Sequence, residues 1–275
     1  MERLILTPNE NRMCGMYQLA KSLDGDIGTV RIKNRLVRLL MFYFPFLINT
    51  RSLKDYDEVV TFLYPTHLIG KKAKKLGKKW ICYDQKVPNP YLFKNFWRRQ
   101  YMKIFLLFNE ITKQGADEYW ELDKIKQEPR YCFEIVDDYC ECHSSHRRKN
   151  PNKCCERCKK NYAIYIGRTE DYKNFDWLKD TMDKLKIPLI HPINEPDNVL
   201  QALLSNAKLL VTASLWEGYG RPVMEAQALG IPVVCYDVGV HKKLVKNGYV
   251  IPVEDKKAFM KAVKIKWNEI ENENK

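Results

Sequence analysis

Two glutamates, Glu217 and Glu225, lie in a glycine-bearing segment that joins a predicted strand to a predicted helix. The segment covers residues 214–226 and reads SLWEGYGRPVMEA. Carboxylates accept hydrogen bonds from pairs of hydroxyl groups, so both glutamates suit a polyhydroxylated ligand. Gly218 and Gly220 let the main chain approach a ligand closely, and a helix start attracts phosphate. We place Glu225 in the first helical turn, where an acid is favourable even without a ligand.

Two cations precede this segment. Arg168 follows a predicted strand, and Lys173 begins the next predicted helix, so both can point into the crevice at the end of the sheet. Fixed cations at such positions stabilise negative charge on a bound ligand. The alternative is that both are ordinary surface residues, which is the usual place for Arg and Lys.

The segment 214–226 resembles the E-x7-E signature of the family 4 retaining glycosyltransferases, with Tyr219 in place of the usual phenylalanine. The flanks at residues 203–208 (LLSNAK) and 228–234 (ALGIPVV) resemble the same family. Ile166-Gly167-Arg168, followed by Lys173-Asn174, resembles its Gly-Arg…Lys-Gly element, although Asn174 stands where glycine is usual. The resemblance extends over residues 162–256.

The resemblance implies a retaining hexosyltransferase of the GT-B fold, with two Rossmann-like domains whose parallel sheets face a central cleft. The catalytic residues would be Glu217, Lys173 and Arg168. Glu225 would bind the donor ribose, Glu217 the transferred sugar, and the two cations the diphosphate. The donor site would also include Gly218, Tyr219 and Gly220. The implied donor is a UDP- or GDP-sugar, the acceptor is an unidentified glycan, lipid or protein, and no catalytic metal is expected.

The N-terminal half resembles the family more weakly. Gly15 lies in the loop after the first predicted strand and would approach the donor phosphates. Arg12 and His67 are the candidates for the acceptor side. Tyr83 stands where the family often has a histidine, and His67 is a substitute for it or an ordinary helix-start residue.

Short apolar runs alternate with amphipathic segments along the chain, which is typical of β-α-β units around parallel sheets. We therefore predict an α/β protein of two Rossmann-like domains. The expected divisions are an acceptor-side domain at 1–131, a Cys/His-rich linker or insert at 132–160, a nucleotide-sugar domain at 161–255, and a C-terminal helix at 256–275 that packs back toward the first domain. The predicted strands are 3–7, 27–32, 58–63, 79–83, 118–122, 162–167, 187–190, 208–212 and 232–236. The predicted helices include 91–114, 174–185, 198–205, 222–229 and one from Asp255 to about 271.

Six of the nine cysteines fall between Cys132 and Cys158. Cys140 and Cys142, with Cys155 and Cys158, supply the four soft ligands that a structural zinc requires. Disulfides and free thiols are the alternatives. The sequence alone leaves the three states open.

A net charge of +13 favours anionic partners such as phosphates, nucleic acid or acidic lipid. Residues 36–48 and 91–108 mix aromatic and basic residues, as helices on a membrane surface do, although buried core helices with charged flanks have the same composition. We expect a cytoplasmic protein, with peripheral contact at the inner face of a membrane as an option. The other functions considered are a phosphorylase or nucleotide-sugar epimerase of the same fold, a non-catalytic sugar-binding domain, and a basic zinc-containing nucleic-acid-binding protein. The last leaves the Glu217–Glu225 segment unexplained.

Overall fold

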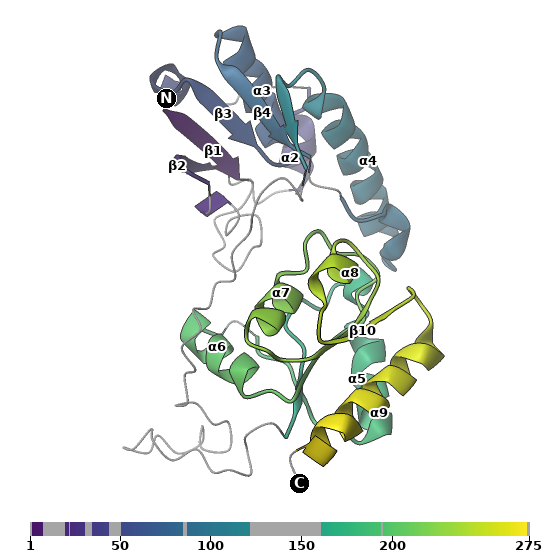
Figure 1. The fold of residues 1–275 in the computed structure, drawn as a ribbon. Coiled ribbons are helices and arrows are strands. Elements are labelled where there is room, and N and C mark those ends of the chain that lie inside the picture. The colour runs from purple at the N-terminus through teal and green to yellow at the C-terminus, as the bar shows by residue number, and fades with distance from the viewer. Residues whose placement is uncertain are drawn as a thin grey trace. The chain divides into compact units, whose positions relative to one another are not determined.

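The computed structural model describes residues 2–7, 20–21, 23–30, 35–43, 51–84, 87–121, 161–193 and 195–273. The chain divides into two compact units, Met1–Glu128 and Pro129–Lys275. Each unit has its own sheet and its own buried clusters, and each is described by itself (Figure 1).

The first unit is built on a five-stranded parallel sheet. Its strands are β1 (Arg3–Thr7), β2 (Asp26–Thr29), β3 (Glu58–Thr61), β4 (Lys79–Tyr83) and β5 (Glu118–Trp120). Their order across the sheet is β2-β1-β3-β4-β5, and in register Ile5 pairs with Ile27 on one side and with Val60 on the other. The direction of strand addition reverses between β1 and β3, where open parallel sheets bind ligands.

Helices of the first unit cover the sheet. They are α2 (Arg35–Leu40), α3 (Thr66–Lys75) and α4 (Phe96–Lys113), with short 3-10 helices at Arg51–Asp55 and Pro90–Leu92. The face of the sheet that holds Leu4, Leu6 and Val59 packs against Phe105 and Phe108 of α4 and against α3. Alternate residues point to the other face, as the period of two requires. Helix α4 begins cleanly because the side chain of Asn95 accepts the N–H of Arg98 at 2.9 Å.

The second unit repeats the plan. Its parallel strands are β6 (Ala163–Ile164), β7 (Leu189–Ile190), β8 (Leu209–Thr212), β9 (Val233–Tyr236) and β10 (Gly248–Ile251), in the order β10-β9-β8-β6-β7. All neighbouring strands are parallel. The order reverses between β6 and β8, so the loops that follow these two strands leave the sheet side by side.

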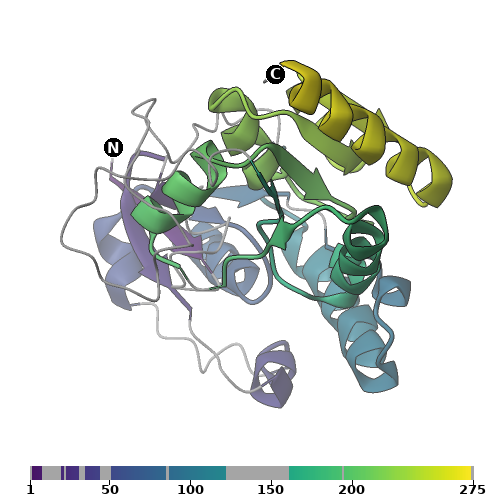
Figure 2. The same cartoon turned by 90° about the horizontal axis from the view of Figure 1, so that it is seen from below.

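Helices cover both faces of the second sheet. They are α5 (Phe175–Leu185), α6 (Asp197–Ser205), α7 (Arg221–Ala228), α8 (His241–Leu244) and α9 (Lys256–Glu273), with a 3-10 turn, η5, at Asp171–Lys173. One face packs against α5 and α9 through Leu178, Met182 and Phe259. The other face packs against α6 and α7 through residues such as Leu203 and Val223. Figures 1 and 2 show α6 on the opposite side of this sheet from α5 and α9.

The C-terminal helix α9 packs on the sheet of the second unit. The side chain of Asp255 accepts the N–H of Ala258 at 3.0 Å and so caps α9, as the sequence suggested. The buried side of α9, with Phe259, Val263 and Trp267, belongs to the core of the second unit. Packing of this helix against the first domain, the option that the sequence suggested, stays a prediction.

Within the ranges described, no helix is both long and apolar enough to span a membrane. The same residues contain no group of three or more His, Cys, Asp or Glu side chains arranged to hold a metal ion. Cys140, Cys142, Cys155 and Cys158, the proposed zinc ligands, lie outside the described residues, as do Gly15 and Arg12.

Candidate active site

The candidate site of the second unit forms where its sheet reverses direction. The loop after β6 carries Arg168 and Lys173, and the loop after β8 carries Glu217. The main-chain N–H of Leu215 donates to the carbonyl of Tyr172 at 2.7 Å, which joins the two loops directly. The Trp216 ring also packs edge-on to Tyr172, with ring centroids 5.7 Å apart. The topology therefore places the predicted cations and Glu217 on adjacent loops.

Lys173 and Glu217 form the central ion pair of this site. Nζ of Lys173 donates to Oε1 of Glu217 at 2.7 Å, and the two side chains are only 13% and 15% exposed. Lys173 ends the η5 turn, and Asn174 then adopts a left-handed conformation with φ 54° and ψ 32° before α5 begins. Asn is among the few residues that tolerate this region, which explains how it stands where related sequences have glycine.

Arg168 belongs to the same loop as Lys173 but extends further into solvent. Its guanidinium contacts the carboxylate of Glu170 at 2.9 Å and the hydroxyl of Tyr172 at 3.1 Å, and its side chain is 74% exposed. The Tyr165 hydroxyl donates to the carbonyl of Arg168 at 2.6 Å. A Cβ on Gly167 would lie 2.7 Å from that hydroxyl oxygen, so this loop conformation requires glycine at position 167.

The position of Glu225 differs from our expectation. Helix α7 starts at Arg221, so Glu225 lies in its second turn, and the first turn contains no acid. We predicted a helix that begins at Pro222. Gly220 has a left-handed conformation with φ 75°, and the helix begins directly after it, at Arg221. Glu225 is therefore one residue further into the helix than predicted. The Glu225 side chain is fully buried, and its Oε1 lies 3.6 Å from Nε of Arg221. It is therefore a buried carboxyl group beside a cation.

The glycines and the tyrosine of the predicted donor loop have distinct local roles. Gly220 sets the start of α7 because its left-handed conformation is strained for other residues. Tyr219 is half-buried, and burial raises the pKa of its hydroxyl. The loop that follows β9 passes close to the carbonyl oxygen of Gly218, since a Cβ built on Gly239 of that loop would lie 2.9 Å from it.

Two histidines at the carboxyl edge of this sheet were missed by the sequence analysis. His191 follows β7, donates from Nε2 to the carbonyl of Gly167 at 2.8 Å, and packs on the Phe175 ring at 4.3 Å. His241 follows β9 and lies beside Gly220. The signal that could have found them is their position, because each comes directly or soon after a strand of a parallel sheet.

His67, our candidate for the acceptor side, lies in the core of the first unit. Its ring is 1% exposed, and Nδ1 lies 2.9 Å from the hydroxyl of Thr61, which also accepts the indole N–H of Trp80 at 2.8 Å. Sγ of Cys82 lies 3.8 Å from the same Nδ1. This placement corrects the expectation, because helix α3 turns its first residues into the sheet and not toward a ligand.

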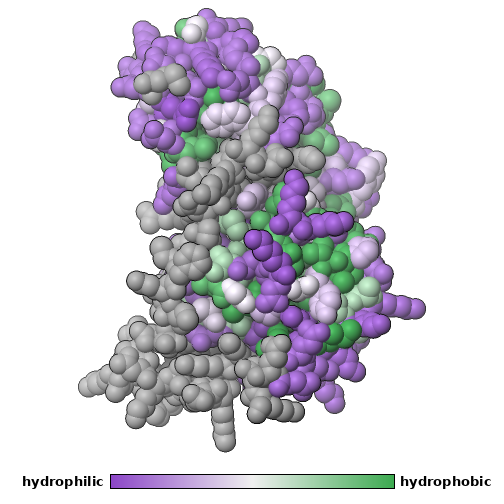
Figure 3. All heavy atoms as spheres, in the orientation of Figure 1, coloured by the Kyte–Doolittle hydropathy of each residue, from purple (hydrophilic) through white to green (hydrophobic). Residues whose placement is uncertain are grey.

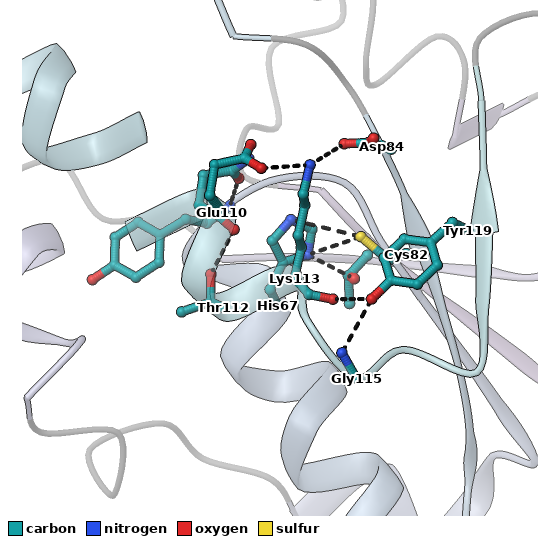
Figure 4. A network of polar contacts seen from close by, with 11 residues as sticks. His67, Cys82, Asp84, Glu110, Thr112, Lys113, Gly115 and Tyr119 are labelled. Atoms are coloured by element: carbon teal, nitrogen blue, oxygen red, sulfur yellow. Dashed lines mark hydrogen bonds and ion pairs between the residues drawn. The ribbon is translucent and has the colours of Figure 1, made fainter. Parts of the chain in front are cut away.

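Figure 4 shows this core network with a second polar cluster beside it. Nζ of Lys113 lies 2.8 Å from both Asp84 and Glu110. Burial lowers the pKa of His67 to about 3, and the Lys113 charge acts in the same direction. His67 is therefore neutral in the folded protein over the range in which a free histidine titrates.

This neutral histidine predicts a pH dependence of stability. Because the folded-state pKa lies below the ordinary value of 6.5, the unfolded chain binds a proton that the folded chain does not. The contribution of His67 is complete above pH 6.5 and is lost as the pH falls, by about 1.4 kcal/mol per pH unit. Urea unfolding of the wild type and of His67→Asn at pH 7, 6 and 5 measures this contribution as a difference in slope. Parallel profiles for the two proteins would contradict the assignment.

Comparison with known proteins agrees with this architecture. The model of the family "Glycosyl transferases group 1" matches residues 189–273, which include Glu217 and Glu225. The O-antigen chain mannosyltransferase RfbU of Salmonella typhimurium is 34% identical over 107 residues. That match covers 38% of this chain and 30% of the relative, so the matched segment spans under a third of the relative's length.

Solved structures resemble nearly the whole chain. WaaG, a glycosyltransferase involved in lipopolysaccharide biosynthesis, superimposes with a TM-score of 0.62 at 14% identity, over 97% of this chain and 90% of WaaG. Anabaena HepE in complex with UDP gives a TM-score of 0.59 at 12% identity, over 100% and 91%. At this identity the likeness shows the fold alone. The chain therefore has the GT-B fold, and residues 189–273 in its second unit are similar to the group 1 glycosyl transferases.

Proposed function

We propose that this chain is a glycosyltransferase that moves a hexose from a nucleoside-diphosphate sugar to a glycan-type acceptor, with retention of anomeric configuration. The observation that carries the proposal is the pairing of Lys173 with Glu217 at 2.7 Å, where the second sheet reverses direction. A cation held there by a neighbouring carboxylate is in place to neutralise the charge that develops on a departing diphosphate. Arg168 lies on the same loop and adds a second, more exposed cation at the solvent side.

The proposed roles of the acids follow from their environments. Glu217 is partly exposed and offers its second carboxylate oxygen to a sugar hydroxyl while Lys173 holds the first. Glu225 is buried beside Arg221, and its proposed partner is the ribose of the donor. In this scheme, the leaving phosphate helps to deprotonate the acceptor, so the transfer needs no strong enzymic base.

The choice of donor is narrowed by the relatives. RfbU is named as a mannosyltransferase of the O-antigen chain, and HepE was solved with UDP. Mannosyl donors linked to GDP and sugars linked to UDP are therefore the first to test. A screen of GDP-mannose, UDP-glucose, UDP-galactose and UDP-N-acetylglucosamine against lipid-linked and free glycans should give a product with one donor, with the anomeric configuration of that donor. Inversion would overturn the mechanism. Absence of binding to both UDP and GDP would overturn the function.

We further propose that the first unit contacts an anionic membrane surface. One stripe of α4 exposes Trp97, Ile104, Leu107 and Ile111, with Trp97 78% exposed. In Figure 3 green spheres appear at the edge of the first unit along which α4 runs in Figure 1. Residues 91–113 contain five basic residues and one acidic residue. An apolar stripe flanked by positive charge suits the headgroup region of acidic lipids.

Vesicle sedimentation tests this surface. The wild type is expected to sediment with phosphatidylglycerol vesicles and to remain in solution with phosphatidylcholine vesicles, because both the apolar stripe and the charge contribute. Trp97→Ser/Leu107→Ser should lower the vesicle binding constant about 100-fold, since each side chain loses roughly 1.5 kcal/mol of apolar transfer energy. Ile265→Ser, an exposed apolar residue of α9, is the matched control. Equal binding by all three proteins would contradict the proposal, and concentration-dependent dimerisation would point to a second copy as the occupant.

A further inference from the structure

His241 is a buried histidine that the proposed chemistry does not use. It begins α8 and is 1% exposed. Its Nδ1 donates to the carbonyl of Tyr236, at the end of β9, at 2.9 Å. Nε2 is buried and has no hydrogen-bond partner among the described residues. Since Nδ1 carries the proton of the neutral ring, Nε2 is an unsatisfied acceptor, which costs free energy and calls for a reason.

The Nε2 edge of the ring faces the start of α7. A Cβ built on Gly220 would lie 2.4 Å from Nε2 and 2.5 Å from Cδ2 of His241. Gly220 has φ 75° and ends the loop that carries Glu217. The histidine ring therefore occupies the space beside Gly220 and supports the main chain where it changes direction into α7.

The chain just before His241 also contacts the loop that carries Glu217. Gly239 has φ 58°, and a Cβ there would lie 2.8 Å from the carbonyl oxygen of Glu217 and 2.9 Å from that of Gly218. Residues 239–241 thus pack against the main chain on both sides of Tyr219. Two glycines from different loops are required for this contact, one on each side.

His241 also lies within electrostatic reach of the proposed catalytic pair. Burial lowers the pKa of His241, while the charges of Glu217 and Asp237 raise it and that of Lys173 lowers it. The ring is therefore close enough to respond to both members of the ion pair. The ring packs against the loop that positions Glu217, one member of the pair.

We infer that His241 is a positioning residue of the donor site. It fixes Gly220 in the left-handed conformation and so holds Glu217 toward Lys173 and aims the first turn of α7. This inference rests on the proposed function of that loop. Gly220 and His241 should therefore be coupled in donor binding and turnover, and not only in stability.

A two-by-two set of variants tests the coupling. The proteins are the wild type, His241→Asn, Gly220→Ala and the double variant, each measured for UDP and GDP affinity, for kcat and KM with the productive donor, and for thermal midpoint. Asparagine keeps a donor for the Tyr236 carbonyl but leaves the space beside Gly220 empty. We expect kcat of His241→Asn to fall about 10- to 100-fold, because a loop displaced by about 1 Å misplaces Glu217. The kcat of Gly220→Ala should fall as far as that of His241→Asn. The fall in kcat of the double variant should be much smaller than the product of the two single falls.

His241→Gln provides a conservative variant, since its amide reaches the position of Nε2 and should recover most of the activity. His67→Asn, the buried histidine of the first unit, is the matched control and should keep the donor affinity of the wild type. If the loss of kcat in the double variant equals the product of the two single losses, the inference is wrong. It is also wrong if His241→Asn keeps the kcat and KM of the wild type. A wild type that binds neither UDP nor GDP would instead refute the proposed function, so the two failures are distinguishable.

Discussion

Replacing Lys173 by alanine is expected to lower turnover about 100- to 1,000-fold, the usual cost of removing one fixed group that stabilises transition-state charge. Nζ of Lys173 lies 2.7 Å from Oε1 of Glu217 in a partly buried setting, so the substitution also leaves Glu217 without this cation. Because the diphosphate gains charge as the sugar leaves, the effect should appear in kcat as well as in kcat/KM. Steady-state rates with the productive donor at saturating acceptor measure it.

A matched control separates chemistry from loss of an ion pair. Lys184 forms a pair with Asp180 at 2.6 Å one helix further on, and both side chains are exposed. Lys184→Ala should leave kcat within about twofold, because exposed pairs contribute roughly 0–1 kcal/mol. Lys173→Arg keeps the charge but changes its geometry, and should give an intermediate rate. If Lys173→Ala retains wild-type turnover while folding normally, Lys173 has no part in the reaction.

The strands were the most predictable part of this fold. Apolar runs such as Leu4–Leu6 and Leu209–Val211 are buried on both faces of a parallel sheet, so they appear in the sequence as continuous hydrophobic segments. Strand β10 was not predicted, because it begins at Gly248 and Asn247-Gly248 is a dipeptide typical of turns. There Gly248 is needed because a Cβ would lie 1.8 Å from the carbonyl of Val233.

The placement of three proposed site residues in the second unit was predictable, because each lies on a loop that follows a strand. Arg168, Lys173 and Glu217 all lie on loops at the carboxyl edge of one sheet, and the order of the strands brings those loops together. The details that depend on packing were not predictable. The left-handed conformation of Asn174 is one example, and the contact between His241 and Gly220 is another, because neither leaves a periodic pattern.

The burial of His67 in the first unit could not be predicted from its position in the sequence. His67 has the sequence position of a ligand-facing histidine, yet inside the core it pairs with the Thr61 hydroxyl, which also accepts the indole N–H of Trp80. Whether His67 is buried or faces a ligand depends on whether the first turn of α3 faces the sheet or solvent. Gly70 decides it, because a Cβ there would lie 2.1 Å from Nε1 of Trp80, so α3 approaches β4 closely enough to bury His67. Sequence spacing alone does not specify such an approach.

Glu225→Gln is expected to weaken donor binding about 10- to 100-fold, since a hydrogen bond to a charged group contributes about 1.5–3 kcal/mol. The Glu225 side chain is fully buried, and its carboxylate lies 3.6 Å from Nε of Arg221. Glutamine keeps the size of the side chain but removes the charge and one acceptor. If Glu225 binds the ribose equally in the ground state and in the transition state, KM for the donor should rise while kcat at saturation changes little.

The ribose hydroxyls provide the discriminating measurement. Wild-type protein should bind the ribonucleoside diphosphate about tenfold more tightly than its 2′-deoxy analogue, since one hydrogen bond is worth about 1–1.5 kcal/mol. Glu225→Gln should lose most of this preference, and both proteins should bind inorganic pyrophosphate alike. Glu58→Gln is the matched control, because Glu58 is also a buried glutamate and pairs with Arg3 and Lys79 in the first unit. It should lower the thermal midpoint without changing the ribose preference. A Glu225→Gln protein that still prefers the ribonucleotide tenfold would show that Glu225 stabilises α7 through Arg221 and does not contact the donor.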